Sequence, residues 1–313
     1  MIDVLIPEQA STAAGQVDLL FLTLIALSGF FIVLIFSLLI YFGIKYRRGS
    51  SADRTAPPAT SIRLELFWTL GPLLLGLPVF VWAASVYLDN SVPPHDALEI
   101  NVVGKQWMWH IQHPDGRREI DELHVPVNQP VKLQMISQDV IHSFWIPDFR
   151  LKQDVLPGRY TTLWFEATQT GTFPLKCAEF CGTHHSFMVG RVIVMEPAEY
   201  QTWLGGEAQG ETLAAQGEQL FARLGCSSCH EPDPEQDGRG PSLLGLYGDE
   251  VELQDGTTLV ADADYIRRSI LEPQEQIVAG YQPIMPSFAG QVDEADLLAL
   301  ISYIQSLSDE TEE

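Results

Sequence analysis

Two stretches without a single charged side chain constrain the fold of this chain more than any other feature. They cover residues 19–44 and 66–88. At about 1.5 Å of rise per residue, a helix over either stretch crosses the roughly 30 Å hydrocarbon core of a membrane. The alternative, a buried helical hairpin in a soluble protein, is disfavoured by these two lengths. The sequence therefore predicts a transmembrane hairpin over 19–89, with helices at about 19–45 and 64–88 and membrane lipid around them.

The charges that flank the two apolar stretches predict their orientation. The connecting loop has five basic residues against one acid, Asp53, whereas residues 1–18 have three acids and no base. The five are Lys45, Arg47, Arg48, Arg54 and Arg63. Cytoplasmic loops are enriched in Lys and Arg, so we expect a two-pass protein of a bacterial inner membrane with both termini on the periplasmic side. The first stretch lacks the flanks of a cleaved signal peptide, so we expect it to stay as an anchor.

After Asp89 the pattern changes from apolar helices to short strands. Alternating runs rich in β-branched and aromatic residues, separated by Pro and Gly, predict a β-sandwich or barrel. The runs are 98–103, 106–111, 131–137, 161–166, 171–176 and 189–195. A segment rich in Gly and Glu follows at 205–211, and the periodicity then becomes helical. A closing amphipathic helix is expected around 297–307, with Asp293 as its N-cap.

The chain has four cysteines, and two of them belong to a motif with soft metal ligands. Cys177 and Cys181 are followed by His185 and Met188, and His142 lies upstream of them. A disulfide is the alternative for two periplasmic thiols, but a disulfide does not explain the other three residues. Thiolate, imidazole and thioether ligands suit copper, and two bridging thiolates allow two copper ions. The adjacent His184 offers the same imidazole, so the residues alone leave the choice of histidine open.

The other two cysteines form a haem attachment signature. In Cys226-Ser-Ser-Cys229-His230 the two thiols would bind the haem covalently, and the histidine would be an axial ligand of the iron. A thioredoxin-like pair or half of a zinc site are the alternatives. The adjacent histidine argues against the first, and the lack of a second Cys-x-x-Cys pair argues against the second. Met285, held between two prolines, is the expected sixth ligand, because no histidine follows His230 and no other methionine follows Met195.

The copper motif, together with the upstream Asp-Val-x-His-Ser, resembles subunit II of the haem-copper cytochrome c oxidases over about 64–195. The resemblance implies a binuclear copper centre, CuA, and favours His185 over His184. The implied ligands are His142, Cys177, Cys181, His185, Met188 and the main-chain carbonyl of Glu179. It further implies that the Glu179 carboxylate reaches a magnesium ion at the contact with subunit I.

Two further residues gain a role only through this resemblance. Trp107, in Gln-Trp-Met-Trp, matches the aromatic residue near CuA that accepts electrons. Glu65, at the cytoplasmic mouth of the second span, matches the entrance carboxylate of a proton path into subunit I. An interfacial residue paired with Arg63 is the alternative for Glu65.

The C-terminal part resembles a class I cytochrome c domain over about 213–307. Gly217 matches the position at which the first and last helices cross closely. Pro241 matches the residue whose carbonyl accepts the ring N–H of the axial His230. The resemblance implies His and Met ligation of the iron, which raises the reduction potential of the haem.

These patterns predict a multidomain fold: a transmembrane α-hairpin, an all-β cupredoxin-like sandwich that holds CuA, and an all-α class I cytochrome c domain. The expected boundaries are an external tail at 1–18, the hairpin at 19–89, the CuA domain at 95–198, a linker at 199–212, the cytochrome domain at 213–308 and an acidic tail at 309–313.

Charge is distributed unevenly along the chain. The formal net charge is −23, and from Glu199 onward 23 acidic residues face four arginines, a net charge of −19. Such a surface excludes nucleic acid as a partner. It predicts an electron donor with a basic docking face, although a proteome adapted to high salt predicts the same numbers.

The resemblance implies the electron-accepting subunit of a caa3-type cytochrome c oxidase. Electrons would pass from an external donor to haem c, then to CuA, and then to the haem of subunit I, where oxygen is reduced to water. Subunits I and III of this proton-translocating oxidoreductase are the expected partners, and the chain alone would not reduce oxygen. A quinol oxidase subunit would lack the copper ligands. A CuA subunit of a nitric-oxide reductase and a membrane-tethered copper assembly protein remain as alternatives.

Overall fold

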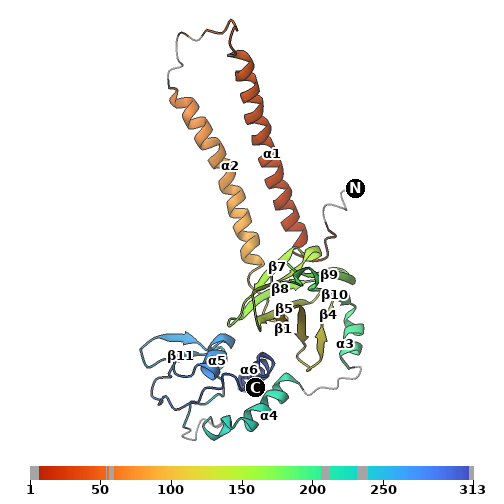
Figure 1. Ribbon diagram of the computed structural model, residues 1–313, viewed down its shortest axis with the longest axis vertical. Coiled ribbons are helices and arrows are strands. Elements are labelled where there is room, and N and C mark those ends of the chain that lie inside the picture. Colours follow the sequence, from red (N-terminus) through yellow and green to blue (C-terminus); the bar gives the residue numbers. More distant parts are fainter. Residues whose placement is uncertain (1–6, 54, 56–59, 206–211, 231–238, 310–313) are drawn as a thin grey trace.

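The computed structural model describes residues 7–53, 55, 60–205, 212–230 and 239–309. Three parts follow one another along the chain and along the long axis of the molecule (Figure 1). A long helical hairpin stands on a β-sandwich, and a helical domain lies on the other side of the sandwich. The predicted order of transmembrane hairpin, β-sandwich and helical domain is confirmed.

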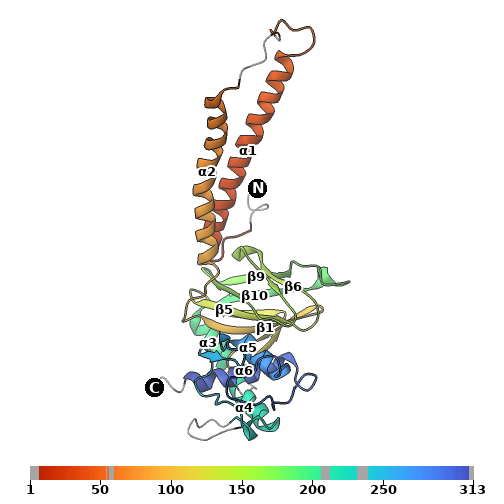
Figure 2. The same cartoon turned by 90° about the vertical axis from the view of Figure 1, so that its left-hand side faces the viewer.

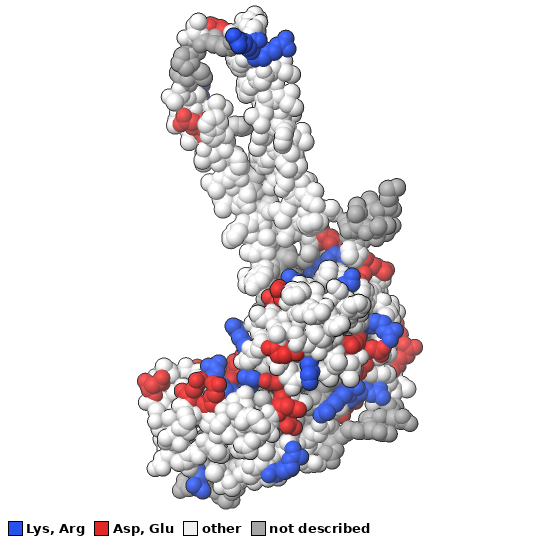
Figure 3. All heavy atoms as spheres, in the orientation of Figure 1, with Lys and Arg blue, Asp and Glu red and all other residues white. Residues whose placement is uncertain are grey.

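The hairpin consists of α1 (Ala14–Lys45) and α2 (Ile62–Asp89). Both helices are long and apolar enough to cross a membrane. Their large apolar side chains are exposed along nearly the whole length, which leaves a bare apolar column with basic residues at its far end (Figure 3). Apolar surface on this scale is not stable in water. The hairpin therefore requires lipid or neighbouring transmembrane helices around it.

Residues 7–18, expected as an external tail, lie against the sandwich instead. The backbone N–H of Ala10 donates to the Asp148 carbonyl at 3.0 Å, and that of Thr12 donates to the Glu166 carbonyl at 3.1 Å. The Arg150 guanidinium holds Asp18, with 2.7 Å between Nε and Oδ1. Helix α1 consequently begins at Ala14. The start of α1 and the end of α2 both lie at the sandwich, as Figure 2 also shows.

Two five-stranded sheets form the sandwich. The first has the order β3-β2-β1-β5-β8, and the second has the order β4-β10-β9-β6-β7. The strands are β1 (Leu98–Lys105), β2 (Met108–Gln112), β3 (Arg118–Ile120), β4 (Glu122–Pro126), β5 (Pro130–Ser137), β6 (His142–Ile146), β7 (Leu151–Val155), β8 (Thr161–Glu166), β9 (Gly171–Cys177) and β10 (Val189–Met195). The β1–β5 and β4–β10 pairs are parallel, and the other pairs are antiparallel. Trp109, Phe144 and Phe149 are fully buried in the core between the sheets.

The predicted strands correspond to β1, β2, β5, β8, β9 and β10, whereas β3, β4, β6 and β7 were not predicted. In β7 only the terminal Leu151 and Val155 are buried, and the three residues between them are polar. Strand β3 has three residues. Such short strands carry too few alternations for a period to be recognised.

Helix α3 (Pro197–Gly205) occupies the beginning of the segment expected as a linker. Its Trp203 stacks on His124 with ring centroids 4.4 Å apart, and the Arg117 guanidinium lies over the same indole at 4.2 Å. The Tyr200 hydroxyl lies 3.2 Å from His113 Nδ1. The helix therefore belongs to the sandwich domain rather than to a free linker.

The helical domain is built from α4 (Leu213–Arg223), α5 (Ala263–Leu271) and α6 (Glu294–Asp309), with a small hairpin of β11 (Glu250–Glu252) and β12 (Thr258–Val260). Helices α4 and α6 cross at Gly217, where an added Cβ would lie 2.0 Å from the Ala299 carbonyl oxygen. Only glycine fits at this crossing, as predicted. Asp293 caps α6 by accepting the Asp296 N–H at 2.9 Å, which was also predicted.

The contact that anchors α3 should depend on Glu119. This buried carboxylate accepts from His113 Nε2 at 2.8 Å and also pairs with His124. We expect Glu119→Gln to lower the free energy of unfolding of the sandwich by about 2 kcal/mol, because hydrogen bonds to a charged group are lost. Glu122→Gln is the matched control: Glu122 pairs with Arg191 at the exposed surface, where an ion pair contributes little. Equal denaturation midpoints for the two variants would contradict the prediction.

The same contact should weaken in acid. Burial raises the pKa of Glu119, but hydrogen bonds with His113 and His124 lower it more, so the pKa lies below its usual 4.5. Because the folded-state pKa is the lower one, the stabilisation is complete above about pH 4.5 and is lost as the pH falls through the folded-state value. Denaturation of the wild type and of Glu119→Gln across this pH range should show the difference between them shrinking.

Candidate metal centre and haem cavity

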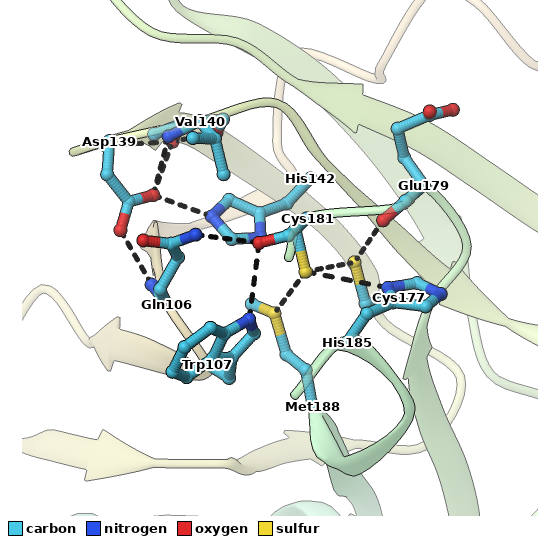
Figure 4. Close-up of polar contacts among 11 residues, drawn as sticks. Gln106, Trp107, Asp139, Val140, His142, Cys177, Glu179, Cys181, His185 and Met188 are labelled. Atoms are coloured by element: carbon cyan, nitrogen blue, oxygen red, sulfur yellow. Dashed lines mark hydrogen bonds and ion pairs between the residues drawn. The ribbon is translucent and has the colours of Figure 1, made fainter. Parts of the chain in front are cut away.

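Neighbouring strands bring the predicted copper ligands together. Strand β9 ends at Cys177, and β6 begins at His142 and pairs with β9 through Phe144 and Cys177. The loop after β9 carries Cys181 and leads through a 3₁₀ turn (His185–Phe187) into β10. Because β9 and β10 are hydrogen-bonded neighbours, this loop folds back over the end of β6. The donor atoms therefore meet at one edge of the second sheet (Figure 4).

The sulfur atoms lie at distances that leave room for metal between them. The two thiol sulfurs are 3.8 Å apart, far beyond the 2.05 Å of a disulfide. Cys181 Sγ lies 3.5 Å from His185 Nδ1 and 3.8 Å from Met188 Sδ. Cys177 Sγ lies 3.2 Å from the Glu179 carbonyl oxygen. The alternative of a disulfide is therefore not what the structure shows.

His142 offers a nitrogen that nothing else uses. Its Nε2 lies 2.8 Å from Asp139 Oδ1, which orients the ring. Its Nδ1 is buried and has no hydrogen-bond partner among the described residues. A ring nitrogen of His142 and the sulfurs of Cys177 and Cys181 all lie within 4.8 Å of one another. Buried nitrogens without a partner are rare in proteins, so this atom fits a metal ligand whose imidazole is oriented by a carboxylate.

The two thiols differ in how readily they lose a proton. Burial raises the pKa of Cys177, but the neighbouring His142 imidazole and backbone groups lower it to about 7. Burial and the adjacent charge of Cys177 raise the pKa of Cys181 to about 12. At neutral pH the Cys181 sulfur therefore keeps its proton, whereas Cys177 is the thiol that ionises more readily. A cation that binds both sulfurs must displace the second proton, so binding of metal is coupled to its release.

Residues around the copper loop occupy distinct places. His184 is exposed and packs edge-to-face on Trp107 with 4.7 Å between ring centroids, so it is His185 that reaches Cys181. Trp107 Nε1 donates to the Cys181 carbonyl at 3.2 Å. The Glu179 carbonyl faces Cys177, whereas its carboxylate points outward from the site. Glu65 lies in the first turn of α2, far from these residues at the opposite end of the hairpin.

Sequence reasoning assigned no role to Asp139, although it orients His142. Its spacing of three residues before a candidate histidine ligand was the available signal. Asp139 is itself held by the backbone N–H of Gln106 at 2.7 Å and by that of Val140 at 2.7 Å. These contacts come from two different loops, so the spacing alone did not show them.

The residues of the haem signature line a cavity in the C-terminal domain. The cavity has a volume of about 380 Å³ and is lined mainly by apolar side chains, and Cys226, Cys229, His230 and Met285 are all part of its lining. His230 Nδ1 lies 2.9 Å from the Pro241 carbonyl oxygen, so the predicted orienting contact is present. A Cβ at Gly240 would lie 2.8 Å from the same ring. Both thiols are free, and the lining fits an apolar planar group.

Comparison with known families matches both sites. The family model described as "Cytochrome C oxidase subunit II, periplasmic domain" matches residues 117–196, and the one described as "Cytochrome c" matches residues 214–308. The first range contains the predicted copper ligands His142, Cys177, Glu179, Cys181, His185 and Met188, and the second contains the haem signature and Met285.

Relatives named cytochrome c oxidase subunit 2 match most of the chain. That of Alkalihalophilus pseudofirmus is 30% identical over 88% of this chain and 82% of its own length. That of Bacillus subtilis is 28% identical over 87% and 82%. The solved periplasmic domain of subunit II of cytochrome oxidase from Bradyrhizobium japonicum is 34% identical, with a TM-score of 0.35, over 36% of this chain and 95% of that chain. By its sequence along most of its length, this chain belongs to the cytochrome c oxidase subunit 2 family of haem-copper oxidoreductase complexes and carries a cytochrome c domain of its own.

Proposed function

We propose that this chain is the electron-accepting subunit of a caa3-type oxidase, with haem c passing electrons to a binuclear CuA centre. The observation that carries the proposal is the presence of both complete donor sets in one chain. Five side chains converge on the copper loop, and the haem signature and Met285 line one apolar cavity. A copper delivery protein has no use for the second set.

The copper pair would be bridged by Cys177 and Cys181. His142 and His185 would supply one nitrogen each, and Met188 and the Glu179 carbonyl would be weak further ligands. Such a centre stores and releases one electron shared between two coppers. The protein's contribution is to bury the thiolates and to fix both imidazoles, so that little rearrangement accompanies a change of charge.

In the second site, the thiols of Cys226 and Cys229 would form thioether bonds to the haem. His230, oriented by Pro241, and Met285 would be its axial ligands. The apolar lining of the cavity would exclude water from the haem, and His and Met ligation would raise its reduction potential. A bound haem of this kind can donate electrons to copper.

The face around the copper loop would dock on subunit I. Ile141, Phe180 and Phe187 are exposed there, with 46%, 75% and 76% of their surface accessible. Exposed apolar patches mark interaction sites, and the hairpin offers a second apolar surface within the membrane. The outward Glu179 carboxylate would bind magnesium at this contact, and Glu65 would admit protons from the cytoplasmic side. Subunit III would complete the complex, and oxygen would be reduced in subunit I.

The proposed function predicts a definite metal content. The complex that contains this chain should hold two coppers and one covalent haem c per chain, apart from the cofactors of subunit I. The copper signal in electron paramagnetic resonance should be that of one electron shared by both coppers. Zinc, or one copper per haem c, would contradict the binuclear assignment. Turnover with oxygen and not with nitric oxide would separate an oxidase from a nitric-oxide reductase.

The two sites should fail independently, because their ligands belong to separate domains. Cys181→Ser should abolish the CuA signal and leave the haem spectrum intact. Met285→Leu should do the converse, keeping the covalent haem but lowering its reduction potential. An unchanged potential in Met285→Leu would mean that another residue ligates the iron.

Asp139→Ala should weaken copper binding by about 10- to 100-fold, because the imidazole of His142 loses the carboxylate that orients it. Asp96→Ala removes an exposed carboxylate before β1 and serves as the control. Copper retained during titration with a chelator measures the effect, and the haem spectrum reports that the chain is folded. Equal retention by the two variants would show that Asp139 does not support the site.

The acidic surface predicts how the external donor binds. Exposed charges act across roughly 8 Å at physiological ionic strength, so a basic donor should associate more slowly with haem c as salt is added. Stopped-flow reduction of haem c by the native donor gives the rate at each ionic strength. A rate that is flat or rises with salt would indicate apolar docking and a surface adapted to salt.

A further inference from the structure

Helix α5 belongs to the haem cavity and to the domain interface at the same time. One face of it lines the cavity, through Tyr265, Ile266, Ser269 and Ile270. The opposite side contacts the sandwich. Asp264 accepts the backbone N–H of Tyr160 at 2.9 Å, and Arg267 Nη1 donates to the Gly158 carbonyl at 3.3 Å. One helix is therefore all that separates the cavity from the copper-bearing domain at this point.

Buried apolar side chains also contribute to this interface between the sandwich and the C-terminal domain. Ile136 and Tyr160 of the sandwich are buried within the apolar cluster that forms the core of the C-terminal domain, and Val103 packs against it. Helix α6 also contacts β1. Arg267 pairs with Glu294 at 2.6 Å, which fastens α5 to α6 beneath the interface. Contacts from backbone, ion pair and apolar side chains together fix how the two domains sit.

The sandwich residues at this interface lead directly to one copper ligand. Ser137 follows Ile136 in β5, and its hydroxyl lies 3.4 Å from Asp139 Oδ1. That same carboxylate oxygen lies 2.8 Å from His142 Nε2. In β1, Gly104 follows Val103, and a Cβ at Gly104 would lie 3.1 Å from the His142 ring. Two short paths thus connect the interface with the cytochrome domain to the His142 imidazole, one through Ser137 and Asp139 and one through Gly104.

We propose that α5 docks the cytochrome domain so that electrons from haem c reach the copper pair on its His142 side, through the ends of β1 and β5, rather than through Trp107. The inference rests on the proposed function. The step moves one electron: the iron goes from ferrous to ferric, the copper pair is reduced by that electron, and no bond forms or breaks. Asp264 and Arg267 are positioning residues in this scheme.

Trp107 lies at a different part of the site. It stands on the turn between β1 and β2 and contacts the Cys181 carbonyl and the exposed His184. Among the described residues, its hydrogen bond and its ring contact are both made within the sandwich domain. Residues 206–211, which connect α3 to the cytochrome domain, lie outside the described residues. Helix α4 adds one contact to those of α5 and α6, because Arg118 Nη2 of β3 donates to Gln216 Oε1 at 3.0 Å.

The docking contact is tested by hydrogen–deuterium exchange on the full chain in its complex. Asp264→Asn should speed exchange at the Tyr160 amide by about tenfold, because its charged acceptor is lost. Tyr160→Phe is the matched control: it keeps the backbone donor and removes a hydroxyl that has no partner among the described residues. Arg267→Gln is a second docking variant, should the first not assemble. Unchanged exchange in both docking variants would overturn the contact.

The electron route is tested in the same samples by photochemical reduction of haem c, followed by the rate at which the copper band bleaches. We expect Asp264→Asn to slow this transfer about tenfold and Tyr160→Phe to leave it within twofold of wild type. Ser137→Ala should slow it more than Trp107→Phe does. The reverse order, or a docking variant that exchanges faster but transfers at the wild-type rate, would overturn the route.

Failure of the proposed function would look different. If the wild-type chain holds both metals but its haem does not reduce the copper, the electron path itself is wrong, and the exchange measurement still decides whether α5 docks as described. If transfer occurs and only the order of the variants is reversed, the proposed function stands and the His142 route does not.

Discussion

The pairing of β6 with β9 is the constraint on which the metal centre depends. It fixes His142 beside Cys177, although the two residues are separated by 35 positions in the sequence. The β9–β10 pairing then fixes where the ligand loop must return. With both strand pairs formed, the sulfurs and the imidazole converge at the ends of these strands. In such a framework the entropy of ordering the ligand side chains is lost during folding, so it is not lost again when metal binds.

Local sequence patterns were sufficient to predict the long apolar helices and the motifs with unusual metal-ligand residues. The apolar stretches gave α1 and α2 to within five residues at each end, and the cysteine, histidine and methionine spacing gave the residues that converge at the two sites. Strands β6 and β7 were missed because their pairing partners, not their own residues, make them strands. Helix α3 was missed because Trp203 and Tyr200 bury themselves against residues some 80 positions earlier.

Contacts between distant segments were equally invisible in the sequence. Nothing around Asp18 or Arg150 indicates that they pair, and nothing around Asp264 indicates that it accepts from Tyr160. Each is an ordinary charged residue in its own segment. Fusing two domains raises their mutual concentration, but concentration alone does not orient them. The contacts of Asp264 and Arg267 with the sandwich fix the orientation of α5.

The docking of residues 7–18 has a consequence for assembly in the membrane. Because α1 is tied to the sandwich at its start and α2 at its end, the chain meets the sandwich at two points instead of hanging from one. Attachment at two points sets the depth and tilt of the copper loop relative to the bilayer before any partner is present. A partner subunit that meets this loop therefore has to find it only by diffusion and rotation within the plane of the membrane. It does not also have to wait for the sandwich to reorient about a single flexible connection.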